Sequence, residues 1–230
     1  MTFLNTILDI VFPVNCIGCG FAGSELCIEC IAEAPTAERE SAKWIFSIFD
    51  YRHPSIKKAL WLLKYKGKKR FAKIFAKVMH GRILEELSEL SVMENFHDAI
   101  LVPIPLSRQR YKERGYNQAE LICNELIKLD RKNNLRHGVD EKLNFSLKKN
   151  ILVKPNDTEH QARIHNRGER LKNIVGSFSV KNTLENINEI KNRNIILIDD
   201  IITTGATLTE ARKTLKQAGA RKVIAFTVAH

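Results

Sequence analysis

Two adjacent carboxylates, Asp199 and Asp200, stand between an apolar run and a turn rich in hydroxyl groups. Residues 195–198 have the composition of a strand buried on both faces, as in a parallel sheet. Backbone N–H groups and hydroxyls just before a helix favour a bound phosphate, and carboxylates accept hydrogen bonds from sugar hydroxyls. The segment therefore predicts a sugar-phosphate site, whose phosphate would be held by Thr203, Thr204, Gly205, Ala206 and Thr207.

Other interpretations of the same residues need no sugar phosphate. A buried strand followed by a capped helix needs no ligand, and paired aspartates also occur in Walker-B-like metal sites and in receiver-domain acidic pockets. A Walker-B site requires a P-loop of the form G-x-x-x-x-G-K-[ST]. Here Gly67 and Lys68 are followed by Lys69, so that partner motif is missing. The sugar-phosphate interpretation is preferred.

Four of the five cysteines form two C-x-x-C pairs: Cys16, Cys19, Cys27 and Cys30. Four thiolates spaced in this way can converge tetrahedrally on one zinc ion. Two disulfides are an alternative, which the cytoplasmic location expected for this chain disfavours. An iron–sulfur cluster uses the same ligands and stays open. We expect a structural zinc ion with no free coordination position for catalysis.

Charge divides the chain. The 230 residues carry a formal net charge of +11, yet residues 1–42 hold one base and six acids. This contrast predicts a four-cysteine zinc-binding module over 1–42, a basic strand and helices over 43–94 that join it to the core, and a ligand-binding core over 95–230. Because no apolar run reaches the roughly 20 residues that cross a bilayer and no basic segment precedes residues 3–14, we expect neither a membrane span nor a signal peptide.

Several elements must position the acidic pair. Aromatic and β-branched residues predict a strand over 44–51, and two prolines end a second strand over 98–105. A basic loop is expected after that second strand, with Arg108, Arg110 and Arg114 directed at a second phosphate group. Such a loop, at the carboxyl end of a strand, lies on the ligand-binding edge of a parallel sheet. A helix from about Leu208 follows the acidic turn.

Residues 52–84 contain eleven bases and no acid. Apolar positions at helical spacing predict two amphipathic helices, separated near Gly67, with basic outer faces. Such a surface suits the phosphate backbone of single-stranded DNA, through Lys57, Lys58, Lys64, Lys66, Lys68, Lys69 and Arg70. Trp61 and Tyr65 are interleaved with these bases, and stacking on nucleotides or burial in the core both stay open for them. A solvated surface that serves only solubility is the alternative for the whole segment.

Taken in order, the motifs of this chain resemble the ComF/GntX family of type I phosphoribosyltransferase-like proteins. They are the cysteine quartet, Lys64-Tyr-Lys-Gly67, Val102-Pro-Ile-Pro105, Arg114-Gly-Tyr-Asn-Gln118, Gln161, Glu169-Arg170-x-x-Asn173, Gly176-Ser-Phe178 and the Asp-Asp-x-x-Thr-Thr-Gly-x-Thr run from Asp199.

The resemblance implies an α/β fold, with a phosphoribosyltransferase-like parallel sheet flanked by helices and a small zinc module. It also implies that phosphoribosyl pyrophosphate (PRPP) is the ligand and Asp199 and Asp200 the catalytic pair that holds the ribose hydroxyls. The threonine-rich turn would then hold the 5′-phosphate, and the three arginines would hold the pyrophosphate. A flexible loop would carry Gln161, Arg170 and Asn173, and Mg²⁺ would be bound mainly through substrate oxygens and water.

Two functions remain open at this point. Family members with a competence role take part in uptake or processing of single-stranded DNA, which implies DNA and other DNA-uptake or recombination proteins as partners. The alternative is an active phosphoribosyltransferase whose acceptor is unidentified, because the sequence shows no nucleobase-recognition element.

Overall fold

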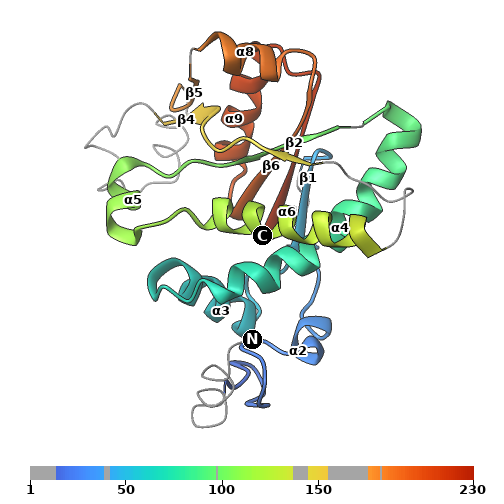
Figure 1. The fold of residues 1–230 in the computed structure, drawn as a ribbon. Coiled ribbons are helices and arrows are strands. Elements are labelled where there is room, and N and C mark those ends of the chain that lie inside the picture. Colours follow the sequence, from blue (N-terminus) through green and yellow to red (C-terminus); the bar gives the residue numbers. More distant parts are fainter. Residues whose placement is uncertain (1–13, 39–41, 97, 137–144, 155–175, 182) are drawn as a thin grey trace.

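A five-stranded parallel sheet forms the centre of the computed structural model, which describes residues 14–38, 42–96, 98–136, 145–154, 176–181 and 183–230 (Figure 1). Its strands are β1 (Ile45–Phe49), β2 (Ile100–Pro103), β3 (Ser146–Leu147), β6 (Asn194–Ile201) and β7 (Lys222–Ala229), in the order β1-β7-β6-β2-β3. A small antiparallel pair joins β4 (Leu152–Val153) to β5 (Ser179–Val180). The predicted α/β class and parallel sheet are confirmed.

Helices cover both faces of this sheet. They are α2 (Ile28–Ala32), α3 (Pro54–Tyr65), α4 (Arg70–Glu94), α5 (Arg108–Arg114), α6 (Gln118–Arg136), α8 (Leu184–Ile190) and α9 (Ala206–Gln217). Along β6, Ile196 and Ile198 pack in one apolar cluster with α3, α4 and α6, whereas Ile195 and Leu197 pack in another with α8 and α9. This alternation explains why the strand is apolar at successive positions. Among the described helices, none is both long and apolar enough to cross a membrane.

Residues of the expected joining segment 43–94 contribute directly to the sheet. Strand β1 pairs with β7 in parallel register, with Ile45 opposite Ala225. Pro54 occupies the first turn of α3, where a missing N–H costs nothing. Gly67, at φ +66°, separates α3 from α4 at the position where the sequence predicted a break. The proposed division into three units remains a prediction, but this segment supplies an edge strand.

The basic segment after β2 is helical, which corrects the expectation of a loop. Ser107 caps the start of α5, its hydroxyl accepting a hydrogen bond from the backbone N–H of Arg110 at 3.3 Å. Gly115 ends the helix in the left-handed region at φ +75°. A serine N-cap and a glycine C-cap are the ordinary signals of helix ends. The loop prediction rested on the run of bases after the strand and took no account of these caps.

The order in which the chain adds strands to the sheet changes direction between β2 and β6. From β2 it continues outward to β3, whereas from β6 it continues through α9 to β7 on the other side. Connections that leave two adjacent parallel strands in opposite directions open a crevice at the carboxyl ends of those strands, where ligands of such sheets bind. The topology therefore places the end of β6, with its acidic pair, at a switch point.

Candidate functional site

The two carboxylates at the end of β6 face opposite sides of the sheet, because successive strand residues alternate. Asp200 shares the side of Ile196 and Ile198, on which α3 packs, and it is buried. Asp199 shares the side of Leu197, and Lys154, directly after β4, acts on it electrostatically. The backbone N–H of Asp200 donates to Asp199 Oδ1 at 2.9 Å. The adjacent acids therefore have different surroundings.

Lys64 of α3 reaches the acidic pair. Its Nζ lies 2.9 Å from Asp200 Oδ1, and the side chains of the two residues are only 16% and 11% exposed. The reason is helical spacing: Lys64 comes one turn after Leu60, which is fully buried, so it lies on the inner face of α3. The sequence pattern alone places Lys64 in the DNA-binding set. In the structure this lysine belongs to the acidic site.

Burial and the neighbouring charge of Asp200 raise the pKa of Asp199 to about 7, although Lys64 and Lys154 lower it in part. A carboxyl that is removed from water beside a second carboxylate favours its neutral form. Near neutral pH the neutral and the charged form of Asp199 are therefore both populated. Asp199 can then donate as well as accept a hydrogen bond.

The turn after β6 presents polar groups next to this pair. Gly205 is the N-cap of α9 and lies at φ +75°, a conformation that glycine adopts without strain. The N-cap Gly205 has no side chain to cap α9, and the first turn of the helix has no acid. The N–H of Ala206 donates to Thr204 Oγ1 at 3.4 Å. The N-terminal amides of α9 and the exposed hydroxyls of Thr203 and Thr204 are thus placed as an anion site requires. The helix begins at Ala206, slightly before the predicted start.

Of the three arginines predicted to hold a second phosphate, Arg108 and Arg110 are exposed on α5, near the end of β2. Arg114 is partly buried and lies over the ring of Tyr65, 5.0 Å from its centroid, with a long 3.5 Å hydrogen bond to the Tyr65 hydroxyl. This contact with α3 gives Arg114 a packing role that the sequence did not predict. Pyrophosphate binding by all three stays a prediction.

Two motifs about 50 residues apart in the chain pack together. The Tyr116 hydroxyl donates to the backbone carbonyl of Leu63 in the last turn of α3. Asn117 donates from Nδ2 to the Ile104 carbonyl at 2.9 Å and accepts from Ala119 N–H at 3.0 Å. The end of β2, the start of α6 and the end of α3 are therefore fixed to one another. The sequence marked both segments as family motifs, but it gave no sign that they contact each other.

The other predicted site residues fall into two groups. Gln161, Arg170 and Asn173 lie outside the described residues. The remaining DNA-binding candidates are exposed: Lys57, Lys58, Lys66, Lys68, Lys69 and Arg70. Trp61 and Tyr65 are 46% and 60% exposed, so both belong to the surface of α3 and not to the core.

The four N-terminal cysteines form one cluster. Their sulfur atoms all lie within 4.8 Å of one another, with Cys19 Sγ and Cys27 Sγ 3.5 Å apart. Zinc–sulfur bonds of about 2.3 Å in a tetrahedron imply sulfur separations of about 3.8 Å, so the donors fit such a metal. The pKa of Cys16 is lowered to about 6. Burial alone would raise it, but hydrogen bonds from the backbone N–H groups of Cys19, Cys27 and Gly18 outweigh that effect. Gly18 is packed against this cluster, since a Cβ there would lie 2.8 Å from Cys30 Sγ.

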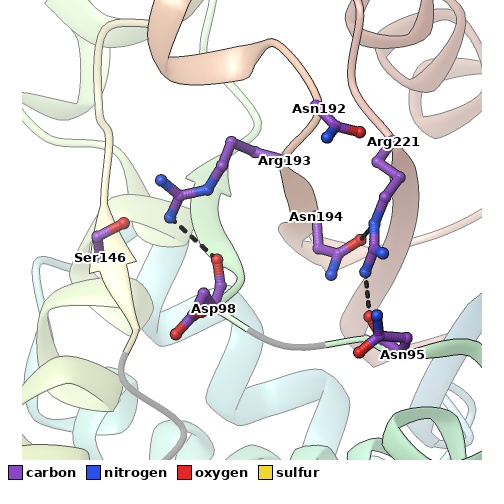
Figure 2. A pocket seen from close by; sticks show the side chains of 7 residues that line it. All are labelled: Asn95, Asp98, Ser146, Asn192, Arg193, Asn194 and Arg221. Atoms are coloured by element: carbon purple, nitrogen blue, oxygen red, sulfur yellow. Dashed lines mark hydrogen bonds between the residues drawn. The ribbon is translucent and has the colours of Figure 1, made fainter.

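A polar cavity of about 530 Å³ lies at the opposite end of the sheet, at the amino ends of β2, β6 and β7 (Figure 2). Figure 2 shows that its two arginines serve nearby groups: Arg193 donates to the Asp98 carbonyl at 3.1 Å, and Arg221 to Asn194 Oδ1 at 3.0 Å. They support loops at the strand starts. This cavity is separate from the acidic pair.

Comparison with known proteins gives a family. The phosphoribosyl transferase domain family model matches residues 142–230, which include the acidic pair and the turn. Competence protein F of Haemophilus influenzae is 28% identical over 89% of this chain and 81% of its own length. DNA utilization protein YhgH of Salmonella typhimurium is 24% identical over 86% of this chain and 74% of its own length.

Among solved structures, a hypoxanthine phosphoribosyltransferase from Staphylococcus aureus matches 70% of this chain and 63% of its own, at 13% identity and a TM-score of 0.36. The domain match and the two sequence relatives, together with the parallel sheet and the cysteine cluster, agree with the resemblance in the motifs. The chain contains a phosphoribosyltransferase domain and is a homologue, over most of its length, of the ComF and YhgH proteins.

Proposed function

We propose that this protein binds PRPP at the carboxyl end of β6. The observation that carries the proposal is the adjacency of two unlike anchors: the Asp199–Asp200 pair, and the α9 N-terminus without a side-chain cap at Gly205. The carboxyl groups bind ribose hydroxyls and the residues Thr203 to Thr207 bind the 5′-phosphate. The arginines of α5, beside the neighbouring strand end, bind the pyrophosphate. The switch point between β2 and β6 supports this arrangement.

The same geometry suits phosphoribosyl transfer. In that reaction the bond between ribose C1 and a pyrophosphate oxygen breaks, its electron pair leaves with pyrophosphate, and an acceptor forms a new bond to C1. Positive charge develops on the ribose ring, which the carboxylates of Asp199 and Asp200 favour. Since Asp200 is already paired with Lys64, a Mg²⁺ ion would be held mainly by substrate oxygens and water, and it would neutralise the pyrophosphate charge.

Calorimetry with PRPP and Mg²⁺ tests the binding proposal directly. We expect saturable binding with one ligand per chain and a rise in melting temperature at saturating ligand, because a ligand that binds only the folded state stabilises it. Pyrophosphate release in the presence of candidate nucleobases then tests transfer. If neither heat nor thermal shift accompanies PRPP addition, the proposal is refuted.

A second proposed function is single-stranded DNA binding by the outer face of α3 and the start of α4. We define this surface as Lys57, Lys58, Trp61, Tyr65, Lys66, Lys68, Lys69 and Arg70. The rings of Trp61 and Tyr65 lie 6.4 Å apart and Lys66 Nζ lies 5.2 Å from the Trp61 ring centroid. Exposed aromatic rings between bases are typical of surfaces on which nucleotides stack while cations contact phosphates. The name of the relative YhgH supports a role with DNA.

Charge reversal tests this surface. A protein with Lys66, Lys68 and Lys69 changed to Glu should bind oligothymidylate far more weakly than wild type. The slope of log affinity against log salt concentration should become shallower by about 0.7 for each phosphate that the variant no longer neutralises. The control reverses three exposed lysines elsewhere, Lys132, Lys181 and Lys213, which changes the net charge equally. Equal affinity in both triple variants would show that only overall charge matters and would reject the surface.

A further inference from the structure

We infer that Lys64 is a further ligand-binding residue of the proposed site, whose ammonium group bridges Asp200 and the pyrophosphate end of the ligand. This inference rests on the proposed PRPP function. It assigns to the acidic site a lysine that lies, in sequence, among the exposed bases of the proposed DNA surface.

The position of Lys64 supports a role inside the site. Its ammonium carries three N–H donors, and the ion pair with Asp200 at 2.9 Å uses one direction among them. At 16% exposure the side chain keeps some contact with solvent, as a group that must reach an incoming ligand requires. Surface lysines on the same helix, such as Lys57 and Lys58, are exposed and lack this partner.

The last turn of α3 holds Lys64 in place. Leu60 and Leu63, which precede it on α3, are fully buried in the core. The Tyr116 hydroxyl binds the Leu63 carbonyl, and Arg114 lies over the ring of Tyr65, the residue after Lys64. These contacts come from the α5–α6 corner, the residues 114–118 where α5 ends and α6 begins. The lysine is therefore placed before a ligand binds, which lowers the entropic cost of binding.

The choice of the pyrophosphate end follows from the two sides of the sheet. The proposed 5′-phosphate site at the start of α9 follows Asp199 and Asp200, and α9 packs on the side of Leu197. Lys64 approaches from the other side, together with Arg114 of α5. The lysine thus lies on the side of Arg114 and away from α9.

Charge explains why the site needs such a lysine. PRPP carries several negative charges, and a pair of carboxylates repels it. Among the described residues, Lys64 from α3 and Lys154 after β4 are cations that act on the pair. Lys64 neutralises Asp200 without occupying all of its lone pairs. The pair can then accept ribose hydroxyls while its repulsion of the pyrophosphate is reduced.

The test compares Lys64→Met with Lys58→Met, a matched loss of charge on the exposed face of α3, by calorimetry in the presence of Mg²⁺. Lys64→Met should bind inorganic pyrophosphate and PRPP about tenfold or more weakly, as expected for loss of a charge-assisted hydrogen bond. Ribose 5-phosphate should bind within about twofold of wild type, because its phosphate lies at α9. Lys64→Arg should restore most of the pyrophosphate affinity, and Lys58→Met should resemble wild type.

A double variant keeps the test valid if Lys64→Met alone does not fold. Lys64→Met with Asp200→Asn leaves no unpaired buried charge, and it is compared with Asp200→Asn alone. If Lys64 contacts the ligand, the double variant binds pyrophosphate more weakly than Asp200→Asn; if the two bind it equally, Lys64 serves only Asp200 and the inference is wrong. Equal losses for pyrophosphate and ribose 5-phosphate in Lys64→Met also overturn it. Failure of the wild type to bind PRPP would instead refute the proposed function itself.

Discussion

Replacement of Cys30 by serine is expected to leave the protein without bound metal and with an unfolded N-terminal module. We propose zinc as the metal of the four-cysteine cluster. Cys30 is buried, and three of the four cysteines pack in the same apolar cluster as Phe49 and Ile56. Structural zinc contributes on the order of 10 kcal/mol to the folding of small modules. Its loss should therefore expose part of the core, and the melting temperature should fall clearly.

Elemental analysis and thermal denaturation measure this effect. Wild type should contain one zinc ion per chain, and Cys30→Ser close to none. Cys123→Ala is the control, because Cys123 is the remaining cysteine, is fully buried on α6 and is not one of the four clustered sulfur ligands. That variant should keep its zinc. Iron in place of zinc would identify an iron–sulfur cluster, and full metal content in Cys30→Ser would refute the ligand set.

Asparagine at either position of the acidic pair is expected to weaken PRPP binding by about 10- to 100-fold, since charge-assisted hydrogen bonds contribute roughly 1.5–3 kcal/mol. Asparagine has nearly the same shape, so strand β6 should persist. Asp98→Asn makes the same chemical change at the far end of the sheet, where Asp98 lines the polar cavity of Figure 2. It should leave PRPP affinity unchanged. Unaltered affinity in both Asp199→Asn and Asp200→Asn would mean that the pair does not hold the ligand.

The two asparagine variants should change stability in opposite directions. The pKa of Asp199 is about 7 in the folded protein, compared with about 3.8 for an aspartate in the unfolded chain. The folded state therefore holds a proton that the unfolded state has lost between about pH 4 and pH 7, and stability falls as pH rises through that window. Asp199→Asn removes this loss, so it should melt higher than wild type at pH 8 and similarly at pH 4.

Asp200→Asn has the reverse effect, because it leaves the largely buried Lys64 without its ion-pair partner. A partly buried charge that loses its partner is destabilising. We expect a lower melting temperature than wild type at pH 8. Thermal melts of both variants at pH 4 and pH 8 would check these signs, and matching melting temperatures at both pH values would contradict the different surroundings of the two acids.

Local chemistry could be predicted from the sequence wherever neighbouring residues carried it. The buried strand that ends at Asp199 and Asp200, the glycine turn before α9 and the paired C-x-x-C motifs each lie within a few consecutive residues. Their types and spacing are sufficient to predict the buried parallel strand and the clustering of the four cysteines, which the structure shows, and they favour a phosphate at the turn, which stays a prediction. The parallel α/β fold followed from the same apolar runs, and it is confirmed.

Assignments that depend on distant partners were decided only by the tertiary structure. Lys64 looked like one more base of an acid-free segment, because the sequence does not show that Asp200, 136 residues later, comes within 2.9 Å of it. The contact of Tyr116 with Leu63 and that of Arg114 with Tyr65 were hidden for the same reason. Conversely, Trp61 and Tyr65 have the helical spacing of a core, yet they are exposed.

The physical reason is that periodicity shows which face of a helix is apolar, but not what packs at the end of that face. On α3, Leu60 and Leu63 are buried in the apolar core. Lys64 follows them at the end of the helix, and its ammonium group contacts the carboxylate of Asp200 at the edge of the sheet. The sequence by itself determined the strands, the turn and the cysteine cluster, because these depend on local composition and spacing. Only the packing of α3 against β6 and the α5–α6 corner decided that one lysine of a basic helix belongs to the acidic site.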